Sequence, residues 1–220
     1  MDPDTDDIPV IPILLLGDDG VGKSTFLSRL TVGAAAPASS LPTLRDLDQP
    51  FVFEIRLYNR NYRFEFYDTA CPTSYTLLKP ALIIVAFSIA NPESLASVHT
   101  RWKQVVEAHF NYDELLPVMV LGLCRDIREK EDYDGRVRRK AKETSLFTQE
   151  DGSEPLNGRQ FVYPQEGLGV AQAMRCDRYC ECSALTGELC REVIEDISRT
   201  AARTTTQKGA KTEGATCLIM

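Results

Sequence analysis

The sequence contains no apolar run long enough to cross a membrane. Its longest apolar stretches are residues 8–16, which two prolines interrupt, and residues 81–87, whereas a spanning helix needs about 18 or more apolar residues. The first seven residues carry four aspartates and neither lysine nor arginine, although a secretory signal begins with positive charge. We therefore expect no transmembrane helix and a chain that stays in the cytosol.

An excess of basic residues is also missing. The 220 residues include 25 Lys and Arg against 32 Asp and Glu, a formal net charge of −7, which argues against bulk affinity for nucleic acid. The two histidines, His99 and His109, have no catalytic partner at a suitable spacing and are interpreted as surface residues. Four cysteines form no CxxC pair and have no histidine nearby, so we interpret them as reduced core residues: Cys176, Cys180, Cys182 and Cys190.

Strand and helix signals alternate along the chain, which is typical of an α/β domain. We predict a six-stranded, mostly parallel sheet with one antiparallel edge hairpin and helices on both faces. The expected strands are residues 13–16, 51–57, 62–66, 81–87, 118–121 and 179–182, and the expected helices are residues 24–31, 92–109, 165–174 and 189–199.

The chain divides into one domain with two appendages. Residues 1–9 are an acidic extension, residues 10–203 are the domain, and residues 204–220 are a tether. Residues 132–160 are polar and carry three glycines and one proline, so we interpret them as an insertion at the rim of the fold.

One motif points to a phosphate ligand. Residues 17–24 read Gly-Asp-Asp-Gly-Val-Gly-Lys-Ser, and they follow a predicted buried strand and open a predicted helix, as a P-loop must. Glycines allow backbone N–H groups to face phosphate oxygens, while the helix N-terminus adds positive partial charge. Lys23 would reach the β- and γ-phosphates, and the Ser24 hydroxyl would ligate Mg²⁺. The sequence therefore predicts a P-loop NTPase fold.

Three further loops end predicted strands of the same sheet. They begin at Asp68, at residues 122–126 and at Ser183, and the carboxyl ends of parallel strands meet at one edge, where ligands bind. By itself the P-loop leaves an ATPase, a kinase and a GTPase open.

Together these stretches resemble a small GTPase of the Ras superfamily, Rho class. The resemblance covers about residues 13–199. It rests on the P-loop, Pro42-Thr43, Tyr67-Asp-Thr-Ala70, Phe87-Ser-Ile89, Pro92-Glu-Ser-Leu95, Trp102, Asp126-Ile-Arg128, Tyr163-Pro-Gln165 and Glu181-Cys-Ser-Ala-Leu-Thr186. The insertion at residues 132–160 falls where Rho proteins carry an insert.

The resemblance implies GTP or GDP and Mg²⁺ as cofactors. Ser24 and Thr43 would ligate Mg²⁺, with Asp68 acting through water. Asp126 would pair with the guanine N1 and N2 hydrogens, and the Ala184 N–H would meet O6. The nucleotide-binding residues it implies are Asp19, Gly20, Val21, Gly22, Lys23, Ser24, Thr25, Thr43, Asp68, Asp126, Ser183, Ala184 and Leu185.

Departures from the family pattern fall on the catalytic side of the site. Pro72 replaces the glutamine that orients the attacking water, and Cys71 replaces the preceding glycine. Proline has neither a side-chain amide nor an N–H. Asp19 stands where the family has glycine, beside the γ-phosphate and in the space of an arginine finger. No catalytic residue is therefore assigned, and we expect slow hydrolysis.

Other departures fall on the base side. Leu123 and Cys124 replace the family's Asn or Thr and its Lys, and Ala36 stands near the position of an aromatic that covers the guanine. We expect weaker guanine affinity, with Asp126 still setting the preference for guanine.

The leading hypothesis is a membrane-tethered, Rho-like signalling switch that binds GTP and acts through effectors. Alternatives remain open: a non-cycling pseudo-GTPase that serves as an interaction module, an ordinary cycling GTPase that positions water with Thr73 or Ser74, and an ATP-specific P-loop enzyme.

The C-terminal residues Cys217-Leu-Ile-Met220 have the C-a-a-X form that directs prenylation. We expect a prenyltransferase, effectors and exchange factors as partners, and no nucleic acid. A single prenyl chain anchors weakly, so we expect reversible association with the cytoplasmic face of a membrane, foremost the plasma membrane. The Rho aromatic of the first switch is here Arg45, so effector identities do not carry over.

Overall fold

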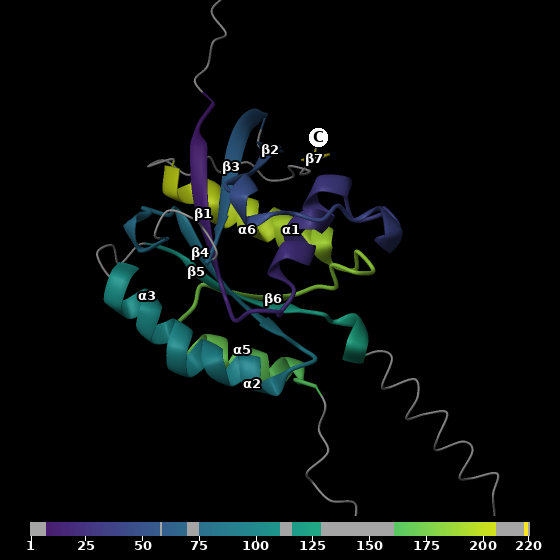
Figure 1. The fold of residues 1–220 in the computed structure, drawn as a ribbon. Coiled ribbons are helices and arrows are strands. Elements are labelled where there is room, and N and C mark those ends of the chain that lie inside the picture. The colour runs from purple at the N-terminus through teal and green to yellow at the C-terminus, as the bar shows by residue number, and fades with distance from the viewer. Residues whose placement is uncertain are drawn as a thin grey trace, which may run out of the picture.

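The computed structural model describes residues 8–57, 59–69, 75–110, 116–128, 161–205 and 218–219. These residues form one sheet with the strand order β6-β5-β4-β1-β3-β2-β7 (Figure 1). The strands are β1 (Val10–Leu16), β2 (Phe51–Leu57), β3 (Arg60–Asp68), β4 (Leu82–Ser88), β5 (Val118–Leu123), β6 (Arg178–Glu181) and β7 (Leu218–Ile219). The pairs that join β3, β1, β4, β5 and β6 are parallel, whereas β2 is antiparallel to β3 and to β7.

The P-loop NTPase fold is thereby confirmed, with the six predicted strands and the edge hairpin. Burial explains their pattern: every residue of the central strand β4 is buried, as its continuous apolar run indicates, whereas β2 alternates buried and exposed residues. Phe53 of β2 and Phe66 of β3 pack edge to face, with ring centroids 5.5 Å apart. The two-residue strand β7 was not predicted.

Helices cover both faces of the sheet (Figure 1). One apolar core lies beneath α1 (Lys23–Val32) and α6 (Cys190–Thr205), and a second lies beneath α2 (Pro92–Ser97), α3 (Lys103–Phe110) and α5 (Pro164–Ala173). Short 3₁₀ turns are η1 (Ala38–Ser40), η2 (Asp46–Asp48) and η3 (Tyr75–Leu77). Within the described ranges, none of the helices combines the length and apolarity that crossing a bilayer requires.

Two helices differ from the predicted ones. The helix expected over residues 92–109 is interrupted by a π-helical segment, Val98–Trp102 (η4), which a spacing of apolar residues does not reveal. The last helix begins at Cys190, because Leu189 has a positive φ of 56°. It then continues to Thr205, beyond the predicted domain end at residue 203.

Candidate functional site

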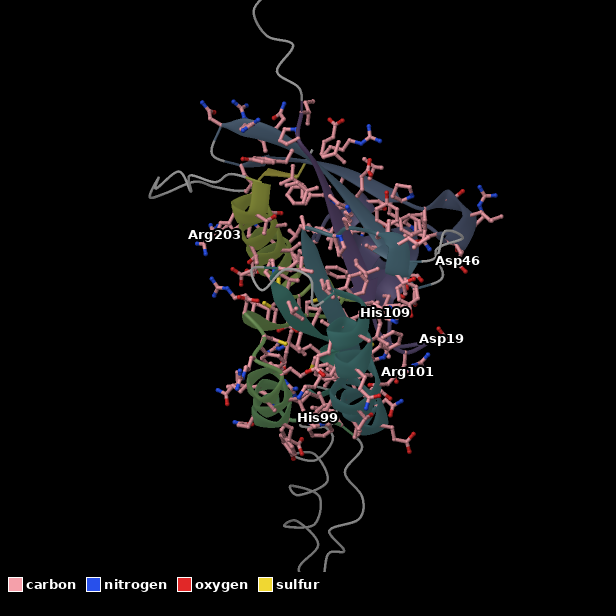
Figure 2. The ribbon with its side chains drawn as sticks, turned by 90° about the vertical axis from the view of Figure 1, so that its left-hand side faces the viewer. Asp19, Asp46, His99, Arg101, His109 and Arg203 are labelled. Atoms are coloured by element: carbon pink, nitrogen blue, oxygen red, sulfur yellow. The ribbon has the colours of Figure 1, made fainter. Side chains whose placement is uncertain are left out.

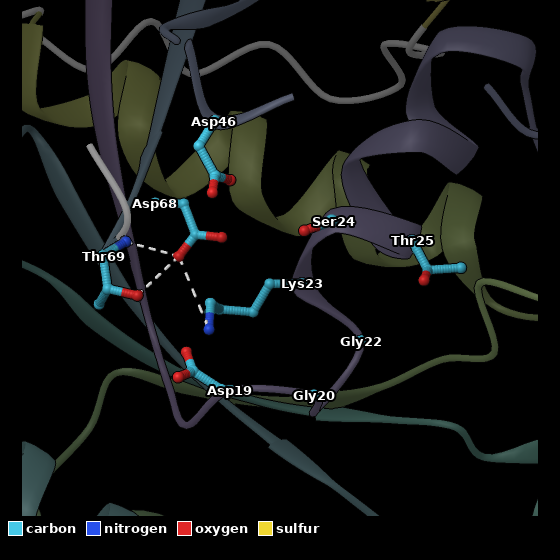
Figure 3. A pocket seen from close by; sticks show the side chains of 9 residues that line it. All are labelled: Asp19, Gly20, Gly22, Lys23, Ser24, Thr25, Asp46, Asp68 and Thr69. Atoms are coloured by element: carbon cyan, nitrogen blue, oxygen red, sulfur yellow. Dashed lines mark hydrogen bonds and ion pairs between the residues drawn. The ribbon is translucent and has the colours of Figure 1, made fainter. Parts of the chain in front are cut away.

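Two adjoining pockets lie at the carboxyl edge of the parallel strands. The first has a volume of about 300 Å³ and is lined by Asp19, Gly20, Gly22, Lys23, Ser24, Thr25, Asp46, Asp68 and Thr69 (Figure 3). The second has a volume of about 340 Å³ and is lined by Gly20, Gly22, Thr25, Ser88, Ala90, Leu123, Cys124, Asp126, Ile127, Ala184 and Leu185. The P-loop residues Gly20 and Gly22 and the following Thr25 line both, so one ligand can extend from the first pocket into the second.

The P-loop adopts its curved path through glycines. Gly22 has a φ of 106° and stands directly before α1, a conformation that other residues rarely adopt. Gly17 has a φ of 147°, and a Cβ there would overlap the carbonyl of Ala86 on β4. The loop therefore lies flat against the sheet and presents the N-terminus of α1 to the first pocket.

Lys23 is held inside this loop. Its side chain is 6% exposed, and its Nζ donates to the carbonyl oxygens of Gly17 and Asp18, both at 2.9 Å. The same Nζ lies 3.6 Å from Oδ1 of Asp68. Since two carbonyls and one carboxylate orient the ammonium, it is positioned in advance for a phosphate in the first pocket.

Three aspartates line the pocket that holds this ammonium. Figure 3 shows Asp68 and Asp19 on either side of the Lys23 ammonium and Asp46 beyond Asp68. Asp68 Oδ1 accepts from the backbone N–H and hydroxyl of Thr69, at 2.5 and 2.8 Å. Three aspartates against one lysine leave the first pocket with excess negative charge, so a polyphosphate needs a cation to bind there.

Hard oxygen donors for Mg²⁺ are present in the same pocket. The Ser24 hydroxyl and the Asp68 carboxylate both line it, and Mg²⁺ is ordinarily held by one or two carboxylates together with substrate phosphates and water. The donor set therefore fits a nucleotide-bound Mg²⁺. Among the described residues, this pocket included, no group of three or more His, Cys, Asp or Glu side chains could hold a metal ion without further ligands such as phosphate and water.

Thr43 is not brought into this set. It is exposed and absent from the lining of both pockets, whereas Asp46, three residues further along, lines the first pocket from η2. Asp46 was not among the predicted binding residues, because its position depends on the path of the whole segment before β2.

The second pocket has a buried polar wall. The Ser183 hydroxyl donates to Oδ1 of Asp126 at 2.6 Å, with Ser183 fully buried and Asp126 6% exposed. Ala184 and Leu185 follow in the same wall. A carboxylate in a largely apolar pocket selects ligands that can donate hydrogen bonds to it.

Leu123 and Cys124 also line the second pocket. Cys124 has a positive φ of 62°, and its Sγ donates a long hydrogen bond of 3.9 Å to the Val21 carbonyl of the P-loop. Burial raises the pKa of the Cys124 thiol, as does the charge of Asp126, against a lowering by a hydrogen bond with Ser88. The thiol is therefore neutral at pH 7, so the pocket lacks the lysine charge of the family here.

An unpredicted contact links the P-loop to the π-helical segment. Trp102 Nε1 donates to Oδ1 of Asp18 at 2.9 Å, and Arg101 Nη1 lies 3.6 Å from the same oxygen. The Arg101 guanidinium stacks over the Trp102 ring, 4.6 Å from its centroid. Arg101 and Asp19 consequently lie on the same side of the molecule (Figure 2), and His99 and His109 are exposed, as expected.

The structure thus brings together most of the predicted binding residues. Val21 differs from them, because its side chain is buried in the core and does not line either pocket. The predicted positions Cys71, Pro72 and Cys217, and the proposed insertion at residues 132–160, lie outside the described residues.

Comparisons with known proteins agree with this geometry. A family model described as "Ras family" matches residues 12–203. GTP-binding protein rho2 of Schizosaccharomyces pombe is 26% identical over 213 residues, which cover 94% of each chain. GTP-binding protein RHO2 of Saccharomyces cerevisiae is 26% identical over 214 residues, 94% of this chain and 95% of that protein. Rho-related protein racM of Dictyostelium discoideum is 25% identical over 198 residues, 86% of this chain and 90% of that protein.

Proposed function

This chain belongs to the Ras family and is a Rho-like small GTP-binding protein, and from that premise we propose that it is a membrane-tethered signalling switch with slow GTP hydrolysis. The observation that supports this proposal is the pair of pockets that share Gly20, Gly22 and Thr25. One carries the lysine and hydroxyl suited to phosphates, and the other carries the carboxylate suited to a base.

The phosphate side acts by orientation and charge. Lys23 is buried, and the carbonyls of Gly17 and Asp18 orient its ammonium group. A bound β- or γ-phosphate would replace these neutral acceptors with a charged one, which forms a stronger hydrogen bond. The N-terminus of α1 adds N–H donors at the same place. Mg²⁺ would be held by the Ser24 hydroxyl, with Asp68 reached through water, and would neutralise phosphate charge. Thr43 would join this set only if the segment before β2 brought it into the first pocket, whose lining it is not part of here.

The base side selects guanine through Asp126. Guanine offers the N1 and N2 hydrogens to one carboxylate, whereas adenine offers neither in that arrangement. A buried carboxylate left without donors costs far more than a missing contact at the surface, so the preference for guanine is large. The hydrogen bond from Ser183 keeps Asp126 in one orientation, and the Ala184 N–H would donate to the guanine O6.

Slow hydrolysis follows from three residues. Pro72 cannot orient water, Cys71 replaces a glycine whose N–H serves the γ-phosphate, and Asp19 adds a carboxylate to the phosphate pocket. Water positioning and an arginine finger supply factors of about 10³ to 10⁵ in related enzymes. With both removed, the bound GTP persists and the protein stays in its effector-binding state.

Single-turnover hydrolysis of GTP by purified protein tests this proposal. We expect wild-type cleavage slower than the order of 10⁻⁴ s⁻¹ of an unassisted small GTPase. The triple variant Asp19→Gly, Cys71→Gly, Pro72→Gln restores the family residues and is expected to cleave GTP at least about tenfold faster. Rapid cleavage by the wild type, stimulated by a Rho activating protein, would refute slow hydrolysis.

One observation favours a second candidate, a non-cycling pseudo-GTPase that serves as an interaction module. Leu123 and Cys124 leave the base pocket without the family's lysine, which weakens nucleotide binding and exchange. Titration with a fluorescent guanine nucleotide in Mg²⁺ separates the two, because submicromolar, exchangeable binding excludes the non-cycling module. Competition by ATP in the same assay tests for an ATP-specific enzyme.

Membrane tethering is proposed through Cys217. A prenyltransferase would modify this residue, and the single lipid would hold the protein reversibly at the cytoplasmic face of the plasma membrane while effectors and exchange factors bind the domain. Fractionation of cells that express Cys217→Ser is expected to move the protein to the cytosol. Unchanged recovery in the membrane fraction would contradict the tether.

A further inference from the structure

The most unusual buried group in the described structure is the guanidinium of Arg29. This residue lies on α1 and is 0% exposed. Its Nε donates to the Ala184 carbonyl at 2.6 Å, and its Nη2 donates to the Leu185 carbonyl at 2.7 Å. Its Nη1 donates to the carbonyls of Ala36 at 2.5 Å and Gly33 at 3.3 Å.

No carboxylate of the described residues forms an ion pair with Arg29. Burying a charge without a counter-charge is costly unless its donors are satisfied. A guanidinium has donors in a rigid planar fork, and here three nitrogens reach four carbonyls that belong to two separate segments. The Arg29 guanidinium therefore joins two chain segments through their carbonyls, and removing it would leave these carbonyls without their donor.

One of the two segments that Arg29 joins lines the base pocket, and the other packs against that segment. Ala184 and Leu185 line that pocket directly. Gly33 and Ala36 belong to the segment after α1, which lies against the same loop: Gly187 has a φ of 83°, and a Cβ added to it would overlap the Ala34 carbonyl. Arg29 and the glycine contact thus hold the two segments together from different sides.

Bonds to two consecutive carbonyls restrict the backbone dihedrals of Ala184 and Leu185. Under the proposed function, the Ala184 N–H in this stretch donates a hydrogen bond to the 6-oxo oxygen of the purine. The same site lacks the family's lysine at Cys124 and its aromatic at Ala36, so the loop gains little order from contacts with the base itself.

We propose that Arg29 is the positioning residue of the base pocket, which holds loop 183–185 ready for a 6-oxopurine nucleotide before the nucleotide binds. This inference rests on the proposed function and adds to it the source of base selectivity. Arg29 touches no nucleotide; it acts through the backbone of Ala184.

A comparison of three nucleotides separates positioning from a merely structural role. GDP carries both the O6 acceptor and the 2-amino donor. In 6-thio-GDP, sulfur replaces O6 and is a poor acceptor, and IDP lacks the 2-amino group that Asp126 would bind. In the wild type, we expect 6-thio-GDP to bind about two- to tenfold more weakly than GDP, the range of one hydrogen bond. Arg29→Lys keeps the positive charge but not the planar fork of donors. In this variant we expect the ratio of the Kd for 6-thio-GDP to the Kd for GDP to fall towards one, while the ratio of the Kd for IDP to the Kd for GDP stays unchanged.

A second variant reaches the same loop without changing the guanidinium. Gly187→Ala forces loop 183–187 away from Ala34. We expect it to reduce the ratio of the Kd for 6-thio-GDP to the Kd for GDP, as Arg29→Lys does. Arg203→Lys, an exposed arginine on α6, is the matched control and is expected to alter neither ratio. Circular dichroism establishes which variants fold, and Gly187→Ala carries the test if Arg29→Lys does not.

The outcomes are distinguishable. Equal weakening of all three nucleotides by the folded variants, with both ratios as in the wild type, means that Arg29 only stabilises the fold and overturns the inference while the proposed function stands. A wild type that binds none of the three nucleotides overturns the proposed function and the inference with it.

Discussion

The Ser183 hydroxyl donates a 2.6 Å hydrogen bond to Asp126, and both residues are buried at the wall of the base pocket. Ser183→Ala removes this donor and leaves a carboxylate oxygen short of a partner, a loss of about 1.5–3 kcal/mol for a charged acceptor. We expect the Kd for GDP to rise tenfold or more, measured by fluorescent nucleotide titration. Ser198→Ala, which removes a buried hydroxyl without a partner in the described structure, serves as the control; equal effects of both variants would contradict a specific role of Ser183.

The hydrogen bond between Trp102 and Asp18 provides a second prediction. The sequence has one tryptophan, so tryptophan emission comes from Trp102 alone and is sensitive to its hydrogen bond with the P-loop. In Asp18→Ala, the indole N–H loses its acceptor and Arg101 loses its ion-pair partner. We expect a shifted emission maximum and a loss of about 1–2 kcal/mol in the free energy of unfolding, measured by urea titration followed by circular dichroism.

Asp48 supplies the control for that variant, because its ion pair with Arg45 is exposed. Asp48→Ala is expected to leave both the emission and the free energy of unfolding unchanged. If Asp18→Ala behaves in the same way, the contact does not stabilise the P-loop.

Excess negative charge in the phosphate pocket leads to a third prediction, on metal removal. Wild-type protein is expected to release guanine nucleotide when EDTA removes Mg²⁺, because three aspartates then face the phosphates with only Lys23 to offset them. Asp46→Asn removes one of these charges and is expected to raise the affinity in EDTA about two- to fivefold at low salt, with less gain at high salt. Asp48→Asn changes a charge on the same turn outside the pocket; a gain as large as that of Asp46→Asn would show that only net charge matters.

Cys180 gives a fourth prediction, on pH. Burial, followed by the charge and hydrogen bond of Asp196, raises the pKa of this thiol from 9.0 to about 12. The unfolded chain therefore loses the thiol proton near pH 9 while the folded chain keeps it, so this contribution to stability is complete below pH 9 and is lost as the pH rises towards 12. We expect a decline of up to about 1.4 kcal/mol per pH unit from this group.

Urea unfolding of reduced protein at pH 7.5, 9 and 10 measures that decline. Cys180→Ala removes the titrating group and is expected to give a shallower slope between pH 9 and 10 than the wild type. Ser198→Ala changes a buried residue of α6 that has no titrating group, and this variant keeps the wild-type slope. Parallel slopes for the wild type and Cys180→Ala would exclude the raised pKa.

Local signals account for what could be predicted. The P-loop is contiguous, so residues 17–24 alone indicate its position and chemistry, and the apolar run of β4 is evident because all its residues are buried. Asp126 and Ser183 could be placed at one edge because parallel strands end there. Their hydrogen bond was not predicted, since it depends on side-chain orientation.

Relationships between distant segments could not be predicted. Arg29 is one polar residue of a predicted helix, and the carbonyl of Ala184 that it binds is 155 residues away. The inward position of Asp46, and the outward position of Thr43, depend on how the turns after α1 pack, for which no sequence pattern exists. Trp102 reaches Asp18 from a π-helical segment, and the spacing of the apolar residues does not distinguish that segment from an α-helix.

The network around Arg128 has a consequence for protein engineering. Its Nη1 and Nη2 donate to Glu181 at 2.7 and 3.1 Å, and its Nε and Nη2 donate to the Val162 carbonyl at 3.1 and 2.7 Å. Arg128 therefore ties together the two points of the domain between which residues 129–160 leave and return. Because the cost of closing a chain grows only logarithmically with its length, about 0.6 kcal/mol per doubling, we expect that an inserted domain in place of those 32 residues would leave the ends held together by Arg128.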